Sequence, residues 1–489
     1  MRLFFYTGEK QEGKSMCKLN QKIQKICEEV LRRVTPSEEE KMKTLRFVES
    51  LSDRLDMELK KLGLEAEIRV EGSIAKDTWL AGEKDIDLFI LIPKEYGRNA
   101  FVKVLEAAKK TSKGNYLEAY AEHPYIQAEI EGFTVDFVPC FKLEKAEDAI
   151  SSVDRTPFHT VYVKKHASPA DRNEVRLLKR FMRGIEAYGA EIKVGGFSGY
   201  LCEILIMHYG SFLNLLRAAS NWREREFIDL EGHYKGREED ALRIFSQPLI
   251  VIDPVDKGRN VASAVSREKL AEFIAASRLF LENPSIRFFF PPEIKALPPE
   301  KAFRIMNSRG TSFIFLKAEP GKAVPDVLWG QLYKSQKALK GLFLRYGFKV
   351  LRDDVWSDEE TAAVFIFELQ SRLLPTVEKH LGPPVTKKED CKRFLKKHLE
   401  STMLISGPRI EGNRWIVERE RRYRDVVDLL KDNLKDGGRK IGVASLLSKA
   451  FSSSMKIWVD DDIKDFYSEN PEFASFLTKY LIGRPRWLQ

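Results

Sequence analysis

Two aspartates one residue apart, Asp85 and Asp87, are the residues whose types and spacing best fit catalysis. They begin the segment DIDLFILI, whose apolar run predicts a buried strand at 85–92. Residues two apart in a strand face the same side, so the two carboxylates should project together. A third carboxylate, Asp136, lies in the strand-like segment FTVDFVPC. Burying such groups is costly unless a cation compensates them, so the set favours a two-Mg²⁺ site for in-line phosphoryl transfer.

An Asp-X-Asp pattern alone is most often a turn or a solvated strand end. Here a Gly-Ser pair lies upstream of the three aspartates, which makes a chance pattern less favoured. Gly72-Ser73 precedes Asp85 with eleven residues between them. Backbone N–H groups and a hydroxyl in such a turn can hold a triphosphate. The turn, the paired aspartates and the later aspartate together resemble the polymerase-β nucleotidyltransferase superfamily.

The elements that must position these residues form an α+β pattern. Alternating apolar residues predict four strands: 66–73, 85–92, 125–132 and 133–140. A helix at about 98–110 interrupts them. Two longer helices precede them, at 20–34 and 37–62, the second with Ser37 and Glu40 at capping-box positions. This order predicts helices packed on a small mixed sheet.

The remainder of the chain predicts a helical central part and a C-terminal sheet domain. Helical spacing runs from about 171 to 218, with helix starts expected at Asp171, where Glu174 would complete a capping box, and at Ser198. A proline-rich stretch, 282–300, marks a linker or domain edge. A β-α-β-β order of the kind found in small RNA-binding domains follows at 311–318, 327–346, 348–354 and 362–370.

Composition limits the class of protein. The 489 residues exceed one ordinary core, so two to four domains are expected. No apolar run approaches the roughly 20 residues that span a bilayer, which predicts a cytoplasmic protein with no membrane partner. The five cysteines lie far apart, which suggests neither a zinc site nor a disulfide framework. The net charge of +9 is compatible with a phosphate-rich partner.

Five sequence blocks between residues 71 and 262 resemble the archaeal-type, class I CCA-adding enzymes, which are tRNA nucleotidyltransferases. The blocks are EGSIAKDTWLAGEKDIDLFIL, YAEHPYIQAEIEGFTVDFVPC, SSVDRTPFHTVYV, NEVRLLKRFMRGIEAYGAEIKVGGFSGYLCE and VIDPVDKGRNVA. Beyond about residue 300 only the order of elements is similar.

The resemblance implies an α+β multidomain fold. It has a polymerase-β-like nucleotidyltransferase head, a helical central domain and an RRM-like α/β body with a helical tail. We accordingly expect an N-terminal extension at 1–19, a catalytic head at 20–152, a central domain at 153–282, an RNA-binding body at 283–385 and 436–489, and the tail at 386–435.

The resemblance also assigns roles to single residues. Asp85, Asp87 and Asp136 would be the catalytic, Mg²⁺-binding carboxylates, although most relatives have Glu at the first position. Eight residues would bind the nucleotide: Gly72, Ser73, Lys76, Thr156, His159, Lys179, Tyr188 and Arg259. Lys179 and Tyr188 would contact the triphosphate. Because they lie nine residues apart, a straight helix would put them on opposite faces, so we expect a helix end near Gly184 or Gly189 that frees Tyr188 from the helix.

Several of these residues also have plain structural interpretations. Lys179 lies in an amphipathic helical pattern and could be a solvated face residue. His159 could be a core histidine with a satisfied hydrogen bond. Arg259, which the resemblance assigns to reading the base, could instead only pair with Asp253 or Asp256. The family pattern favours the functional interpretation for each.

Residues 8–15, GEKQEGKS, match the P-loop pattern GxxxxGKS, and the preceding RLFFYT is strand-like. A P-loop also needs a parallel sheet and an acidic strand end to hold its metal. The chain continues instead into two helices, and one isolated strand cannot build that sheet. We therefore interpret the match as a coincidence within an N-terminal extension.

The expected reaction is template-independent addition of C, C and A to the 3′ end of tRNA from CTP and ATP, with release of pyrophosphate. Basic residues interleaved with aromatic ones, at 414–424 and 483–489, suit RNA phosphates and bases, although 414–424 could be a helix with a solvated charged face. Family members grip the acceptor stem and TΨC arm of tRNA, and they are often homodimers. The alternatives are another RNA nucleotidyltransferase, such as a poly(A) polymerase, or a non-catalytic RNA-binding protein.

Overall fold

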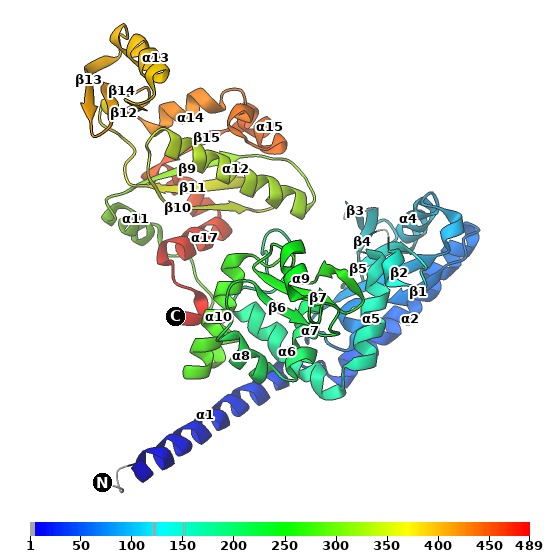
Figure 1. The fold of residues 1–489 in the computed structure, drawn as a ribbon. Coiled ribbons are helices and arrows are strands. Elements are labelled where there is room, and N and C mark those ends of the chain that lie inside the picture. Colours follow the sequence, from blue (N-terminus) through cyan, green and yellow to red (C-terminus); the bar gives the residue numbers. More distant parts are fainter. Residues whose placement is uncertain (1–4, 121–123, 150, 152) are drawn as a thin grey trace. The chain divides into compact units, whose positions relative to one another are not determined.

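The computed structural model describes residues 5–120, 124–149, 151 and 153–489, and it divides into two compact units (Figure 1). Unit 1 comprises 1–293 and 484–489, and unit 2 comprises 294–483. The division falls inside the proline-rich stretch 282–300. Residues 121–123 and 152, which belong to the sequence blocks quoted above, lie outside the described residues. The finer domain boundaries expected from the sequence stay predictions.

A five-stranded sheet forms the N-terminal part of unit 1. Its order is β1 (Glu67–Val70), β2 (Asp85–Ile92), β5 (Phe133–Phe141), β4 (Pro124–Ile130) and β3 (Tyr116–Tyr120). β2 and β5 run parallel, and the other neighbours are antiparallel. Helices α2 (Glu38–Lys61) and α4 (Ala100–Thr111) share one apolar core with the sheet. The four strands expected from the sequence are confirmed, but the first ends at Val70, because residues 72–76 form a short helix, and β3 was not foreseen.

The N-terminal helix α1 (Phe5–Val34) contains the whole P-loop-like segment 8–15. A P-loop needs an irregular glycine-rich loop before a helix, so the helical backbone removes that interpretation. The strand expected for 2–7 is wrong for residues 5–7, which are helical, whereas 1–4 lie outside the described residues. The next helix begins as predicted, because the Ser37 side chain accepts a hydrogen bond from the Glu40 backbone N–H at 3.1 Å.

The central part of unit 1 is mainly helical. Its helices are α5 (Thr156–His166), α6 (Pro169–Gly184), α7 (Gly199–Tyr209), α8 (Phe212–Ala219), α9 (Glu238–Ile244) and α10 (Arg267–Glu282). A small sheet that the sequence analysis did not foresee joins them: β6 (Glu226–Asp229), β7 (Leu249–Asp253) and β8 (Asp256–Asn260). The start of α6 differs from expectation, since Ser168 caps it in a box with Asp171, whereas Ser198 caps α7 as predicted.

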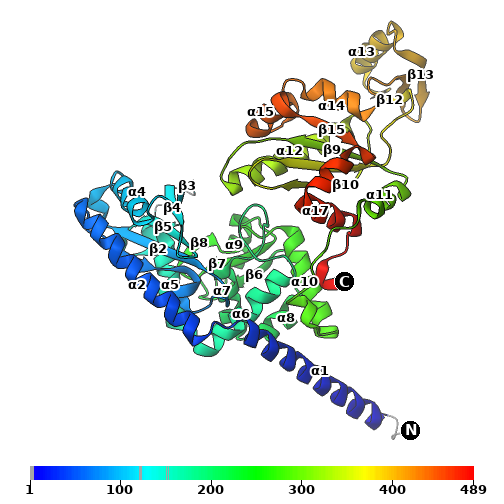
Figure 2. The same ribbon diagram turned by 180° about the vertical axis from the view of Figure 1, so that it is seen from behind.

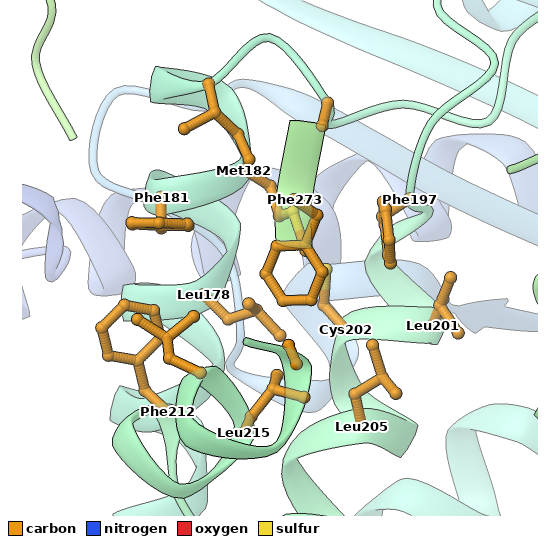
Figure 3. Packing of buried hydrophobic residues seen from close by; sticks show 14 of the residues in the cluster. Leu178, Phe181, Met182, Phe197, Leu201, Cys202, Leu205, Phe212, Leu215 and Phe273 are labelled. Atoms are coloured by element: carbon orange, nitrogen blue, oxygen red, sulfur yellow. The ribbon is translucent and has the colours of Figure 1, made fainter. Parts of the chain in front are cut away.

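Apolar side chains from α6, α7, α8 and α10 pack together in this central part (Figure 3). Phe181 of α6 makes edge-on contacts with Phe212, at 5.5 Å between ring centroids, and with Phe280, at 5.7 Å. The last residues of the chain also join this core, because Trp487 stacks on Phe288 at 5.4 Å. This dry packing gives α6 and α7 a fixed spacing. Both helices carry residues of the site described below.

Unit 2 is built on a βαββαβ chain order that gives an antiparallel sheet, β10-β11-β9-β15. Its elements are β9 (Ser312–Ala318), α12 (Pro325–Arg345), β10 (Val350–Ser357), β11 (Ala363–Leu369), α14 (Val426–Leu434), α15 (Ser445–Ser454) and β15 (Lys456–Val459). This is the order and pairing of a ferredoxin-like or RRM-like fold. The predicted β-α-β-β pattern is therefore confirmed.

Both faces of this sheet are covered. Ile314 and Leu316 of β9 pack with α12, α14 and α15. The alternate residues Phe313 and Phe315 pack with α11 (Pro299–Ser308), α16 (Lys464–Glu469) and α17 (Pro471–Ile482). An RRM usually stacks bases on aromatic residues of one open sheet face. That mode is closed to this sheet.

A separate subdomain interrupts the unit 2 fold between β11 and α14 (Figure 2). It consists of β12 (Val377–Pro384), α13 (Lys388–Leu399), β13 (Leu404–Glu411) and β14 (Arg414–Glu420), with strand order β12-β14-β13. The segment expected as a helical tail thus contains two strands besides helices. The helical interpretation of 414–424 is wrong, because Arg414–Glu420 form strand β14 and 421–424 are not helical.

Within the described residues, every helix is too short or too polar to cross a membrane. The cysteines whose side chains are described, Cys27, Cys140, Cys202 and Cys391, are free thiols.

Candidate active site

The parallel pairing of β2 and β5 brings two of the predicted catalytic carboxylates together. In this register Asp87 lies directly opposite Asp136, whereas Asp85 lies opposite Thr134. Asp136 also accepts a hydrogen bond from the Gln127 side chain of β4 at 2.9 Å. Asp85 is exposed at the beginning of β2. The strand spacing inferred from the sequence thus holds for all three residues, with Asp85 at the solvent end.

Burial makes these carboxylates poor anions without a cation. It raises the pKa of Asp136 to about 6, and the charges of Asp87 and Asp85 act in the same direction. Burial also raises the pKa of Asp87, although Lys76 opposes the shift. Oxygen donors in this situation suit a hard divalent cation, which would relieve both burial and repulsion. Among the described residues, no three acidic, histidine or cysteine side chains already converge as a metal cage.

The Gly-Ser turn lies against this carboxylate pair. Gly72 has φ +67°, and a Cβ at this position would lie 1.9 Å from Asp87 Oδ2. Only glycine can adopt this backbone without strain and also let the turn approach the carboxylate. A triphosphate held at the turn would therefore have its phosphates next to Asp87.

A cleft of about 430 Å³ opens beside the turn. All eight residues predicted to bind the nucleotide line it: Gly72, Ser73, Lys76, Thr156, His159, Lys179, Tyr188 and Arg259. Asp87 lines it as well. The cleft therefore brings together side chains from the head and from the central helices. Their individual roles in binding stay predictions.

The end of the cleft nearest the Gly-Ser turn, the phosphate end, is organised by Glu203, which the sequence analysis missed. Its carboxylate accepts hydrogen bonds from Lys76 Nζ and from the Thr78 hydroxyl, both at 2.6 Å. Lys179 Nζ lies 3.7 Å from the same carboxylate and donates to the Thr78 carbonyl oxygen at 3.1 Å. The solvated alternative for Lys179 is wrong, since its side chain is 1% exposed.

The opposite end of the cleft, the base end, is organised by Asp253, the last residue of β7. Asp253 Oδ2 accepts from Arg259 Nη1 at 2.7 Å and lies 2.9 Å from His159 Nε2. Its other oxygen accepts from the Tyr200 hydroxyl at 3.1 Å. Burial opposes ionisation, yet His159 and Arg259 hold the pKa of Asp253 at about 2. The ion pair foreseen for Arg259 exists, while Asp256 pairs instead with Arg155 at 2.8 Å.

Tyr188 reaches the cleft because α6 ends at Gly184, as expected. The chain beyond the helix pairs Tyr188 with Phe197 in a short parallel bridge. A Cβ on Gly199 would lie 3.1 Å from the Tyr188 hydroxyl and 3.5 Å from Lys179 Nζ. Glycine at 199 thus leaves room for both side chains at the beginning of α7.

Comparison with protein families places this cleft among the nucleotidyltransferases. The model described as "Nucleotidyltransferase domain" matches residues 52–159, and "tRNA nucleotidyltransferase, second domain" matches 173–290. A third model, "CCA-adding enzyme, C-terminal domain", matches 309–453.

Whole-chain relatives narrow the class. The CCA-adding enzyme of Methanosarcina acetivorans is 36% identical over 458 residues, which cover 92% of this chain and 97% of that protein. Those of Methanosarcina barkeri (40%; 83% of this chain and 88% of that protein) and Methanothermobacter thermautotrophicus (35%; 92% and 97%) are also similar. The chain therefore belongs to the CCA-adding enzyme family, and the similarity extends through the C-terminal half. Among solved structures, Cid1 poly(U) polymerase covers 53% of this chain and 94% of its own, at 17% identity and a TM-score of 0.42.

Proposed function

We propose that this enzyme adds C, C and A, without a nucleic-acid template, to the 3′ end of tRNA. It uses CTP twice and ATP once and releases pyrophosphate at each step. The observation that carries the proposal is a single cleft in which a Gly-Ser turn, two buried lysines and a base-end Arg–His pair lie beside Asp87. Membership of the CCA-adding family supports the choice of tRNA and of these two nucleotides.

In each addition the 3′ hydroxyl oxygen of the RNA forms a bond to the α-phosphorus of the nucleotide. The bond from that phosphorus to the β-phosphate bridging oxygen breaks, and pyrophosphate leaves. Mg²⁺ bound by Asp85, Asp87 and Asp136 would supply activation of the hydroxyl and charge stabilisation of the leaving group. Gln127 fixes the orientation of Asp136 through the 2.9 Å hydrogen bond.

The protein's own groups divide the nucleotide between the two ends of the cleft. Ser73 and the backbone of the Gly72 turn would bind the triphosphate, with Lys76 and Lys179 as cationic partners. Thr156 and Tyr188 would complete the walls of the pocket. Arg259, held in place by Asp253, would present guanidinium donors to acceptors on cytosine or adenine.

The tRNA partner is expected along its acceptor stem and TΨC arm. Both faces of the unit 2 sheet are covered, so we expect contacts to RNA phosphates and sugars from its basic surface segments, including residues 421–424 after β14. We further propose a cytoplasmic enzyme. A homodimer remains a proposal from the family alone, to be tested by measuring molar mass in solution.

The decisive experiment supplies purified protein, Mg²⁺ and a tRNA transcript lacking CCA with CTP, ATP, both, UTP or GTP. Products are resolved to single nucleotides. Two additions with CTP alone and one more with ATP are expected. A long adenylate tail would instead identify a poly(A) polymerase. Binding of tRNA without any incorporation would leave a non-catalytic RNA-binding protein.

A further inference from the structure

Glu203 is a fully buried carboxylate with no assigned part in the reaction. It lies on α7 within the apolar run LCEILI, and its side chain is 1% exposed. A buried carboxylate is costly unless cations or hydrogen-bond donors compensate it. Here the compensating groups are lysines that line the nucleotide cleft, so a ligand that binds these lysines would also affect Glu203.

Three elements converge on this carboxylate. Lys76 comes from the short helix α3 (Gly72–Lys76), Thr78 from the segment after it, and Lys179 from α6. Lys76 is 2.6 Å from Glu203 Oε2, and Lys179 is 3.7 Å from Oε1. The Thr78 hydroxyl donates to Glu203 and in turn accepts from Lys179 Nζ at 3.1 Å. One carboxylate therefore forms ion pairs with two ammonium groups at once.

In the empty cleft, the Glu203 carboxylate offsets part of the positive charge of Lys76 and Lys179. Two ammonium groups and one carboxylate leave a net charge of one positive unit, whereas a nucleoside triphosphate brings several negative charges. Lys76 and Lys179 hold Glu203 ionised, since its pKa lies below the usual value despite burial. Phosphate oxygens and the Glu203 carboxylate would therefore compete for hydrogen bonds from the same ammonium groups.

We propose that Glu203 is a positioning residue that acts as a resident anion, competing with phosphates for Lys76 and Lys179. When pyrophosphate leaves, the two ammonium groups return to Glu203, so the departing anion is not retained. Release matters here because the proposed function, on which this inference rests, requires pyrophosphate to leave three times. Without Glu203, no described carboxylate would form an ion pair with either lysine, and only more distant charges such as Asp87 would act on them.

The test measures binding of inorganic pyrophosphate to the full chain, without tRNA, by titration calorimetry. In Glu203→Gln the amide keeps the shape but not the charge, so pyrophosphate should bind about 3- to 10-fold more tightly. Steady-state kcat should fall at least about 3-fold while single-turnover addition of the first C changes less. The KM for CTP should not rise. Glu203→Asp, which restores the charge, should return pyrophosphate affinity toward that of the parent.

Glu368→Gln is the matched control. Glu368 of β11 is also fully buried and is likewise bound to one cation and one threonine, Arg309 at 2.7 Å and the Thr311 hydroxyl at 2.8 Å. It lies in unit 2, so its loss should leave pyrophosphate affinity unchanged. If Glu203→Gln folds poorly, Thr78→Val removes one of the bonds that hold the carboxylate and should shift pyrophosphate affinity in the same direction, by less.

Weaker or unchanged pyrophosphate binding in a folded Glu203→Gln variant would overturn the inference. A parallel loss of thermal stability, CTP affinity and pyrophosphate affinity would also overturn it, because it would indicate a structural role only. The proposed function fails separately, if the parent protein binds pyrophosphate but adds no nucleotide to tRNA.

Discussion

At each end of the cleft a buried carboxylate holds two basic side chains, but the basic side chains differ in type. At the phosphate end the buried carboxylate of Glu203 holds Lys76 and Lys179; at the base end that of Asp253 holds His159 and Arg259. Lysine ammonium groups are compact charges with rotatable donors, whereas guanidinium and imidazole groups are planar with fixed donor directions. Charge alone can hold the triphosphate that CTP and ATP share, whereas discrimination between bases requires hydrogen-bond donors with fixed directions.

Tyr200 joins the two ends. Its hydroxyl donates to Asp253, its ring stacks on His159 at 4.0 Å, and Lys76 Nζ lies 5.6 Å above the same ring. The comparison therefore concerns neighbouring groups in one cleft, and substitutions can test how far the ends act separately.

Asp87→Asn should have the largest effect, because it removes the carboxylate next to the Gly-Ser turn and opposite Asp136. Incorporation of C should fall at least about 10³-fold, corresponding to about 4 kcal/mol. CTP binding, measured by calorimetry without divalent metal, should change little, which would separate the chemistry from both ends of the cleft. Retained incorporation would show that Asp87 is not catalytic.

Asp253→Asn should disturb the base end alone. Arg259 and His159 would lose their shared anion, so kcat/KM for CTP should fall about 10- to 100-fold, as expected for an interaction of about 1.5–3 kcal/mol with a charged group. Misincorporation of UTP, scored on the tRNA transcript, should rise relative to CTP. Pyrophosphate affinity should stay at the parent value; an equal shift there would merge the two ends into one network.

Asp136 differs from Glu203 and Asp253, because it is a buried carboxylate with which no described cation forms an ion pair. The pKa of Asp136 is about 6 in the folded protein and about 3.9 in the unfolded chain. The contribution of Asp136 to the free energy of unfolding is therefore fully present below about pH 4 and is lost as pH rises through 6. In metal-free protein, Asp136→Asn should therefore raise the unfolding free energy at pH 8 by about 2 kcal/mol. The gain should shrink at pH 5. Thermal unfolding with a chelator measures it, and a gain independent of pH would contradict this account.

Tyr200→Phe should have the smallest effect. It removes one hydrogen bond to Asp253, worth about 1 kcal/mol, and keeps the ring beneath Lys76. We expect the KM for CTP to rise about 2- to 5-fold with no change in pyrophosphate affinity. Steady-state assays on the same transcript measure the first, and calorimetry the second. A change at the phosphate end would mean that the hydroxyl also orders the lysines.

The sequence predicted the catalytic strands well because their apolar runs and alternation are local signals. It could not reveal β13, β14 or β6, since short strands on exposed or small sheets carry charged residues without a clear period. The start of α6 was misplaced because Asp171 belongs to the cap of Ser168 and does not begin the helix.

Of the two carboxylates at the centre of the comparison, Glu203 was overlooked and Asp253 was foreseen only as a possible partner of Arg259, although the positions of both carry a signal. Glu203 interrupts an apolar helical run, and Asp253 ends an apolar strand. A single charged residue inside such a run needs a partner of opposite charge, so its presence in the sequence predicts a buried ion pair. The partners of Glu203 could not be predicted, because tertiary packing brings Lys76 and Lys179 to it, whereas Arg259 lies only six residues from Asp253.

The return of residues 484–489 to unit 1 has a consequence for how the enzyme is made. Trp487, which packs on Phe288 in the core of unit 1, follows the whole of unit 2 in the sequence. A ribosome must therefore finish the whole of unit 2 before the catalytic unit can close its own interior. A chain that stops early would carry every residue of the cleft and yet lack its final aromatic anchor, so it would be exposed to proteolysis before it could act on RNA.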